Sequence, residues 1–172
     1  MSNEVLYVSD NFFSAGRTDI YNSDKVKIGE LDLKSAFTSS LDVYDLDGNA
    51  LLSGRFPFFS NKWMVTDQAG REIGELKAKF AFFSEKYEYY ANAGESYRIE
   101  SEAFSKLYQI LDRNEKEVAR FEKVSGFFSS PVFQLTNSTG HINSFELIAV
   151  VMGVNEIKKR RQSAANSGGG AH

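Results

Sequence analysis

The chain has 172 residues, a formal net charge of −3 and no cysteine, and 14% of its residues are aromatic. This length is typical of one domain with a sizeable core, and the nearly balanced charge argues against a nucleic-acid partner. The absence of cysteine excludes a disulfide framework, a zinc–thiolate site and a thiol nucleophile, and it favours a reducing, cytoplasmic location.

Most of the chain is predicted to form β-structure. The opening sequence MSNEVLYVSDNFF has neither the basic region nor the apolar run of a signal peptide. After it, the chain repeats a unit of about 22 residues, an apolar strand followed by an Asp/Asn-x-x-Gly turn and a second apolar strand. The clearest copies are Val43, Asp45, Gly48 and Leu51; Val65, Asp67, Gly70 and Ile73; and Ile110, Asp112, Val118 and Phe121.

The repeated unit is typical of a β-hairpin. The Asp or Asn side chain can accept hydrogen bonds from the turn backbone, and Gly adopts a positive φ without steric cost. Within the strands, polar and apolar residues alternate, so Trp63, Val65 and Asp67 are predicted to share one face. About six such units predict an antiparallel meander of about twelve strands. The DLDGN sequence at 45–49 does not fit an EF-hand calcium loop, because Val43 would occupy its first ligand position.

One helix is predicted near the C-terminus, over residues 144–159. Asn143 is a natural N-cap, and Glu146 can complete a capping box with it. Leu147–Val154 contains no polar side chain, so the helix has no solvent-facing side. The apolar run is shorter than the roughly 20 residues that cross a bilayer. We therefore expect a buried helix and no transmembrane span.

The width of the predicted helix matches the estimated width of the barrel's bore. Twelve strands spaced by about 4.8 Å and tilted by about 40° close into a barrel about 24 Å across. Inward side chains leave a bore of about 12 Å, and a helix with its side chains is about 10–12 Å wide. The predicted fold is all-β with one buried helix, a closed antiparallel barrel of about twelve strands around a central apolar C-terminal α-helix. The domain is predicted over residues 1–159, with a flexible tail at 160–172.

The order of these elements resembles the tubby C-terminal-like superfamily, and within it the LURP-one-related proteins, relatives of the phospholipid scramblases. The resemblance covers residues 5–159, and it rests on the repeat positions and the terminal helix: Val43, Asp45, Gly48, Trp63, Val65, Asp67, Gly70, Ile110, Asp112 and FELIAVVMGV. It implies a twelve-stranded barrel around a helix and a link to lipid or membrane association. No position matches a phosphoinositide-binding motif, and no cysteine-rich palmitoylation segment is present.

Catalysis, metal binding and a cofactor are not expected. His141 falls in a predicted turn and His172 is the last residue, and neither belongs to a nucleophile or metal motif. The glycines at 168–170 lack the lysine and the following helix of a phosphate-binding loop. A triad that combines His141 with distant Ser and Asp residues is the alternative that sequence alone leaves open.

Two features are candidates for binding. The sequence FFS occurs four times, and in a strand one Phe of each pair would face outward. These side chains either pack under loops or form a partner surface: Phe12, Phe13, Phe58, Phe59, Phe82, Phe83, Phe127 and Phe128. The basic run Lys158, Lys159, Arg160 and Arg161 either complements the helix dipole or contacts anionic lipid headgroups.

The sequence thus predicts a non-enzymatic binding or scaffold module that recognises anionic phospholipid or a membrane-associated partner. The location expected for such a module is the cytoplasm, with peripheral attachment to the membrane. Two alternatives remain: a purely protein-interacting module that uses outward Phe side chains, and a barrel that carries a small hydrophobic ligand in its bore.

Overall fold

The computed structural model describes residues 3–34, 39–79, 85–101 and 106–168. Within these residues twelve strands, a short 3₁₀ helix η1 (Asp10–Phe13) and one α-helix, α1 (Ser144–Ser167), are present. The strands are β1 (Glu4–Ser9), β2 (Gly16–Asn22), β3 (Lys27–Leu33), β4 (Ser40–Tyr44), β5 (Ala50–Arg55), β6 (Trp63–Asp67), β7 (Glu72–Lys79), β8 (Lys86–Ala91), β9 (Ser96–Ser101), β10 (Leu107–Leu111), β11 (Glu117–Val124) and β12 (Val132–Asn137).

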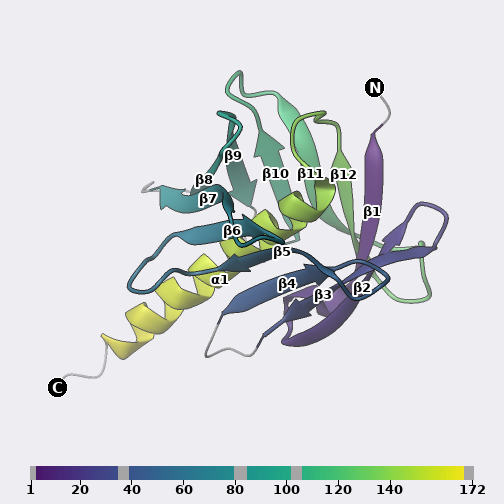
Figure 1. Ribbon diagram of the computed structural model, residues 1–172, viewed down its shortest axis with the longest axis horizontal. Helices are drawn as coiled ribbons and strands as arrows, with labels where there is room; N and C mark the ends of the chain where they lie inside the picture. The colour runs from purple at the N-terminus through teal and green to yellow at the C-terminus, as the bar shows by residue number, and fades with distance from the viewer. Residues whose placement is uncertain (1–2, 35–38, 80–84, 102–105, 169–172) are drawn as a thin grey trace.

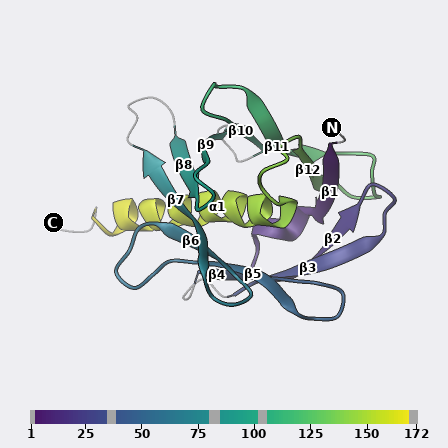
Figure 2. The ribbon, with the colours of Figure 1, turned by 45° about the horizontal axis from the view of Figure 1, so that its top comes forward.

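The strands form one closed antiparallel barrel. Each strand pairs with its neighbours in the chain, and β1 closes the barrel against β12, from Glu4 opposite Asn137 to Ser9 opposite Val132. The helix α1 runs through the barrel and projects beyond it at one end (Figures 1 and 2). The predicted fold class is therefore confirmed.

Alternation of apolar and polar residues sorts side chains to the two faces of the sheet. In β6, Trp63 and Val65 are fully buried against the helix, as the pattern predicts. The register shifts between Val65 and Thr66, however, and Thr66 is buried as well. This irregularity interrupts the strict period of two, so Asp67 does not share the inward face with Trp63 and Val65.

The repeated turns have the predicted chemistry. In the turn after β4, Asp45 Oδ1 accepts hydrogen bonds from the backbone N–H groups of Asp47 and Asn49, at 2.9 and 2.8 Å. Gly48 takes a φ of +81° there. The equivalent position after β10 is Glu115, a non-glycine residue that also adopts a positive φ, of +63°.

The core of the barrel is α1 itself. Leu147–Val154 is buried, as predicted, and Asn143 Oδ1 caps the helix by accepting the backbone N–H of Phe145 at 2.7 Å. The capping box is not formed in the described structure, because the Glu146 carboxylate accepts the Tyr89 hydroxyl of β8 at 2.5 Å. Along this segment the helix side chains pack against the inward side chains of the strands inside the barrel.

The helix is longer than the sequence indicates. It continues past residue 159 to Ser167, so residues 160–167 of the predicted flexible tail are helical. These last residues are exposed, and they include Gln162, Ser163 and Ala164–Ala165, which are compatible with a helix but carry no apolar periodicity. Residues 169–172 of the predicted tail lie outside the described residues.

Candidate functional site

The barrel has two different ends because successive connections of an up-and-down meander alternate between them. The helix enters at the end that carries the short Asp-x-x-Gly turns. It leaves at the opposite end, which we call the exit end, where Lys159 contacts the β1–β2 connection and Arg160 contacts the β5–β6 loop (Figure 2). The predicted basic run is on the part of α1 that leaves the barrel, so it belongs to the exit end.

The three Phe pairs that the structure describes are in connections rather than within strands, which corrects for them the expectation of one inward and one outward Phe. Phe12 and Phe13 are in η1, and Phe58 and Phe59 are in the β5–β6 loop. Phe127 and Phe128 are in the β11–β12 loop. Phe82 and Phe83 lie outside the described residues.

The Phe12–Phe13 pair serves packing. Phe12 is fully buried, with its ring 5.2 Å from that of Phe121, and Phe13 packs edge-on against Phe133 at 5.3 Å. They close the barrel beside the helix. Neither side chain forms the exposed partner surface that the sequence suggested for it.

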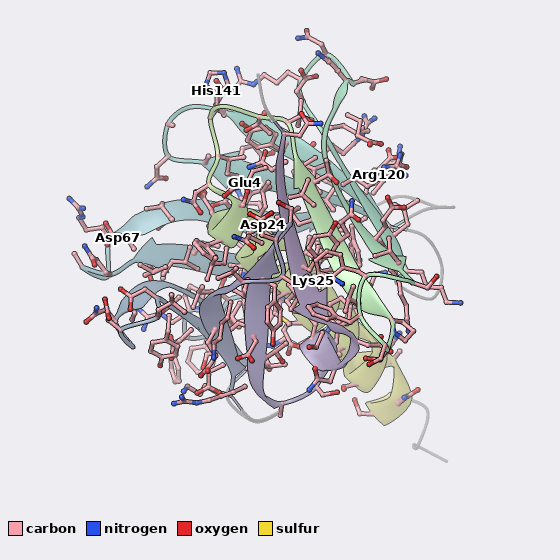
Figure 3. The ribbon with its side chains drawn as sticks, turned by 90° about the vertical axis from the view of Figure 1, so that its right-hand side faces the viewer. Glu4, Asp24, Lys25, Asp67, Arg120 and His141 are labelled. Atoms are coloured by element: carbon pink, nitrogen blue, oxygen red, sulfur yellow. The ribbon has the colours of Figure 1, made fainter. Side chains whose placement is uncertain are left out.

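The β11–β12 loop folds back over the outside of the barrel. The Phe127 ring stacks on Tyr7 of β1 with centroids 3.5 Å apart, and Phe128 packs edge-on against Tyr21 of β2 at 5.0 Å. The Lys25 ammonium lies 5.2 Å from the Phe127 centroid. Figure 3 shows Lys25 on the β2–β3 side of the molecule. Both rings are half-buried, so this pair mainly covers neighbouring strands, which is the packing alternative considered above.

Phe58 and Phe59 are the exposed pair. Their side chains are 89% and 97% exposed, although large aromatic side chains usually bury most of their surface. The two rings contact each other, with centroids 4.1 Å apart. Phe59 has a φ of +57°, a region that bulky residues avoid. The loop thus presents two apolar rings to solvent at the exit end.

The four residues of the basic run have different roles. Lys158 pairs with Glu85 at 2.9 Å. Lys159 pairs with Glu156 of its own helix at 3.0 Å and donates to the Phe13 carbonyl at 3.2 Å. These two lysines therefore fasten α1 to the surrounding connections, and their charges are partly neutralised.

Arg160 joins the helix to the loop that carries the exposed rings. Its guanidinium lies over the Phe56 ring, 3.5 Å from the centroid, and its Nη1 donates to the Ser60 carbonyl at 3.0 Å. Phe56 packs edge-on against the buried Trp63, whose indole N–H donates to the Ala149 carbonyl inside the barrel. A continuous set of contacts thus runs from the core of α1 to the Phe58–Phe59 tip.

A pocket of about 400 Å³ lies beside Arg160, between the last turns of α1, the β5–β6 loop and the end of β7. The apolar side chains of its walls are Phe56, Ala78, Ile157 and Ala164. The cationic side chains are Lys62, Lys77, Arg160 and Arg161, and Asn61 completes the lining. Arg161 is exposed and reaches this pocket as part of the predicted basic run, while Lys62 and Lys77 come from elsewhere in the chain.

One carboxylate, Glu75, accompanies the two lysines of the pocket. Lys77 lies 2.8 Å and Lys62 3.3 Å from Glu75 oxygens. Burial raises the pKa of Glu75, but hydrogen bonds from Lys77 and Lys62 outweigh it, so the pKa is lowered overall. The bond to Glu75 also raises the pKa of Lys77. Both shifts favour the charged forms of Glu75 and Lys77 near neutral pH, and the four cationic side chains outnumber this carboxylate, so the pocket is positive.

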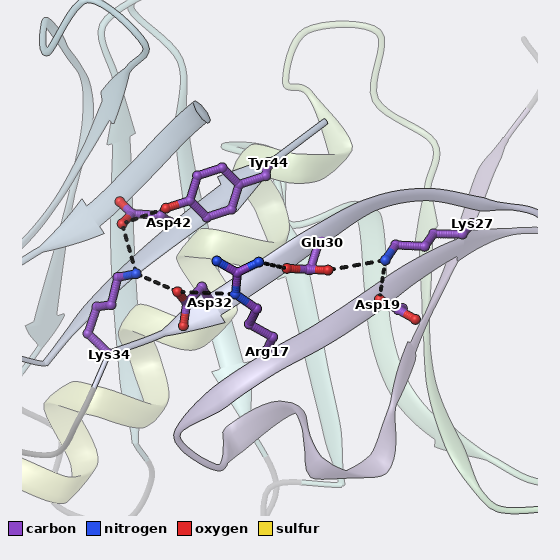
Figure 4. Close-up of polar contacts among 8 residues, drawn as sticks. All are labelled: Arg17, Asp19, Lys27, Glu30, Asp32, Lys34, Asp42 and Tyr44. Carbon is purple, nitrogen blue, oxygen red and sulfur yellow. Dashed lines mark hydrogen bonds and ion pairs between the residues drawn. The ribbon is translucent and has the colours of Figure 1, made fainter. Parts of the chain in front are cut away.

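The outer face of β2, β3 and β4 carries a different kind of charge cluster. Acidic and basic side chains alternate there in a ladder, with Arg17 2.9 Å from Glu30 and Lys27 2.6 Å from Asp19 (Figure 4). Lys34 pairs with Asp32 and lies 3.7 Å from Asp42. Each cation has a carboxylate partner, which is typical of a solvated face and not of a ligand site.

His141 is the residue on which the catalytic alternative depends. This side chain is exposed on the β12–α1 connection at the turn end (Figure 3) and is remote from the pocket described above. In the described ranges, no group of three or more His, Cys, Asp or Glu residues is placed to hold a metal ion. Over the same ranges no helix has the length and hydropathy to span a bilayer.

A closed twelve-stranded barrel threaded by a C-terminal helix is the tubby-like class of fold. The family model described as LURP-one-related matches residues 4–152, so the chain belongs to the LURP-one-related family. The X-ray structure of an Arabidopsis thaliana protein superposes with a TM-score of 0.62 at 10% sequence identity, with 91% of each chain covered. At this identity the likeness shows the fold alone. The comparison with curated protein sequences finds no match.

The sequence predicted only part of the exit end. The exposed pair Phe58–Phe59 and Arg161 were among its candidates, whereas Phe56, Lys62 and Lys77 were not. Pro57 and Asn61 were usable signals, because both residue types favour loops and could have placed the intervening Phe pair in a connection. No sequence signal pointed to Lys77, which reaches the pocket only because β7 ends beside α1.

Proposed function

We propose that the protein is a non-enzymatic binding module that attaches peripherally to anionic membrane surfaces through the exit end of its barrel. The observation that carries the proposal is that Phe58 and Phe59, two nearly fully exposed rings, lie on the loop that also carries Lys62 and that Arg160 contacts at the Ser60 carbonyl. Membership of the LURP-one-related family supports a binding or scaffold role. A cytoplasmic protein that binds the inner leaflet fits this arrangement.

Both forces that hold peripheral proteins on membranes are available at this end. Aromatic rings insert at the level of the lipid headgroups, and burying a large apolar side chain contributes about 1.5–3 kcal/mol. A Lys or Arg close to an anionic surface contributes about 1 kcal/mol. The Phe pair extends from a loop that Arg160 holds in place, so little ordering of the loop is needed on binding.

Sedimentation with vesicles containing phosphatidylglycerol, at low salt, tests the proposal. The double variant Phe58→Ser/Phe59→Asn removes both rings, and Asn tolerates the positive φ of position 59. We expect its vesicle affinity to fall at least tenfold. Leu46→Ser is the matched control, because Leu46 is 64% exposed on a turn at the opposite end of the barrel.

The outcomes separate the classes of function. Binding that falls with added salt and with the double variant, but not with Leu46→Ser, supports attachment through the exit end. No binding of the unchanged protein to anionic vesicles at low salt would overturn the membrane proposal. Equal binding to vesicles of neutral phosphatidylcholine would overturn the part played by the cations.

A further inference from the structure

We infer that the pocket beside Arg160 is a binding site for a single amphipathic anion, a molecule with a carboxylate or phosphate head on an apolar body. The occupant is distinct from the membrane surface of the proposed function, because the site can take one dissolved molecule without a bilayer. The inference rests on the walls, the charge and the accessibility of the pocket.

The walls have two chemical parts. Phe56, Ile157, Ala78 and Ala164 provide an apolar side that comes from a loop, a helix and a strand. The volume of about 400 Å³ lies within the range of roughly 300–1,000 Å³ that is typical of small-molecule sites. An apolar body placed against these side chains would be shielded from water, which is favourable.

The cations form the second part, and they exceed the carboxylates around them. Lys62 and Lys77 share Glu75, whereas Arg161 has no ion pair within the described residues. The Arg160 guanidinium is already stacked on Phe56, and it still contributes its positive charge to the wall. An oxyanion at this rim would gain charge-assisted hydrogen bonds from Lys and Arg donors. A cationic ligand would be repelled.

Two further hollows in the described structure lack this combination. One of them shares Arg160 with this pocket and is otherwise lined by polar and charged side chains, among which Glu156 pairs with Lys159. The one beside the β2–β4 ladder contains Glu30, Asp45 and Asp47. The first has no apolar side chain in its lining, and in the second three carboxylates outnumber Arg17 and Lys27. Of these three hollows, the pocket beside Arg160 is therefore the one that fits an amphipathic anion.

The chain contains a natural reporter for this site. Trp63 is the single tryptophan, and its ring lies 5.1 Å from that of Phe56 in the pocket wall. Titration with dodecyl phosphate and with laurate, each below its micellar concentration, should change Trp63 fluorescence in a saturable way, and calorimetry should give the same affinity. Inorganic phosphate and dodecyltrimethylammonium are the comparison probes, and each should bind at least a hundredfold more weakly.

Two pairs of variants locate the site. Ala164→Phe fills the pocket from an exposed helix position, while Ala165→Phe adds the same ring one residue away, outside the pocket lining. We expect at least a tenfold loss of affinity for dodecyl phosphate in the first variant and no change in the second. Arg161→Gln should weaken binding about tenfold, whereas Lys116→Gln, at the opposite end of the barrel, should not.

Each contrary result overturns a defined part of the inference. Equal losses in Ala164→Phe and Ala165→Phe, or no saturable binding by the unchanged protein, would remove the pocket as the site. Phosphate binding as tight as that of dodecyl phosphate would remove the apolar part, and equal binding of the cationic probe would remove the anion. The Phe58→Ser/Phe59→Asn variant should still bind dodecyl phosphate, so failure of the membrane proposal is distinguishable from failure here.

Discussion

At the scale of single residues, Trp63 is held between two glycines. A Cβ atom on Gly153 of α1 would lie 2.4 Å from Trp63 Cδ1, and one on Gly54 of β5 would lie 2.5 Å from Cζ2. Such distances are far below van der Waals contact. The indole therefore fits between the helix and the barrel wall only because both neighbours lack a side chain, and the sequence repeat did not reveal this requirement.

We predict that Gly153→Ala destabilises the protein, although alanine is the better helix former by about 1 kcal/mol. Overpacking of a core typically costs about 1–3 kcal/mol, and the clash with Trp63 should reverse the sign of the helix preference. Denaturant unfolding measures the change in the free energy of unfolding. In a Trp63→Leu background the same substitution should cost less, and an equal cost in both backgrounds would contradict the proposed clash.

Glu146 and Tyr89 form a second close pair between the helix and the wall. The Tyr89 hydroxyl, on a fully buried side chain, donates to the Glu146 carboxylate at 2.5 Å. Burial raises the pKa of Glu146, and the hydrogen bond from Tyr89 lowers it to a smaller extent, so the pKa stays above its ordinary value of 4.5. Burial and the nearby Glu146 carboxylate also raise the pKa of Tyr89.

A pH dependence follows from the raised pKa of Glu146. The folded protein binds more protons than the unfolded chain between pH 4.5 and the raised value, so ionisation of Glu146 weakens folding as the pH rises through this interval. Glu146→Gln should therefore gain stability relative to the unchanged protein from pH 4 to pH 7, as measured by denaturant unfolding. Tyr89→Phe removes the hydrogen bond that lowers the pKa of Glu146, so in this variant the loss of stability should extend to higher pH. A stability difference between Glu146→Gln and the unchanged protein that stays constant from pH 4 to pH 7 would refute the assignment.

At the scale of elements, α1 has two parts with different roles. Leu147–Ile157 is the core of the barrel, whereas the segment from Gln162 to Ser167 is exposed throughout. The sequence predicted the first part because an all-round apolar run has one physical explanation in a chain of this kind. It did not predict the second part, because an exposed polar helix has no apolar periodicity and continues here from a helix that is already formed.

We predict that shortening the helix separates these roles. A chain that stops after Arg161 should unfold with nearly unchanged stability, within about 1 kcal/mol, because no buried side chain is lost. A chain that stops after Met152 loses the buried Val154 and Ile157 and should show no cooperative unfolding. Circular dichroism during thermal and denaturant unfolding checks both, and equal behaviour of the two chains would contradict the division.

The Phe pairs show where a rule of strand periodicity fails at the element scale. The outward placement of one Phe per pair assumed that each pair was inside a strand. Phe58–Phe59 and Phe127–Phe128 instead occupy connections, and their surroundings decide which pair is exposed: Tyr7 and Tyr21 cover the second pair, and nothing in the described structure covers the first. Contacts between segments distant in the chain cannot be obtained from local patterns.

At the scale of the whole molecule, the fold was more predictable than the site. The strand count, the closure and the buried helix followed from one repeated turn, whose Asp and Gly chemistry is local, and from the size match between helix and bore. The pocket depends on how β7, the β5–β6 loop and α1 meet in space. Its residues Lys62, Lys77 and Arg161 come from three separate segments, and such meetings depend on tertiary packing.

The position of α1 also bears on how the chain is made. The barrel encloses a segment that is synthesised after all twelve strands, and β1 must wait for β12 before the sheet can close. On the ribosome, the hairpins therefore emerge with their apolar faces uncovered, and long-range closure is slow compared with hairpin formation. Until Ile157 has left the ribosomal tunnel, the nascent chain lacks its own interior, and protection by chaperones is most needed in that interval.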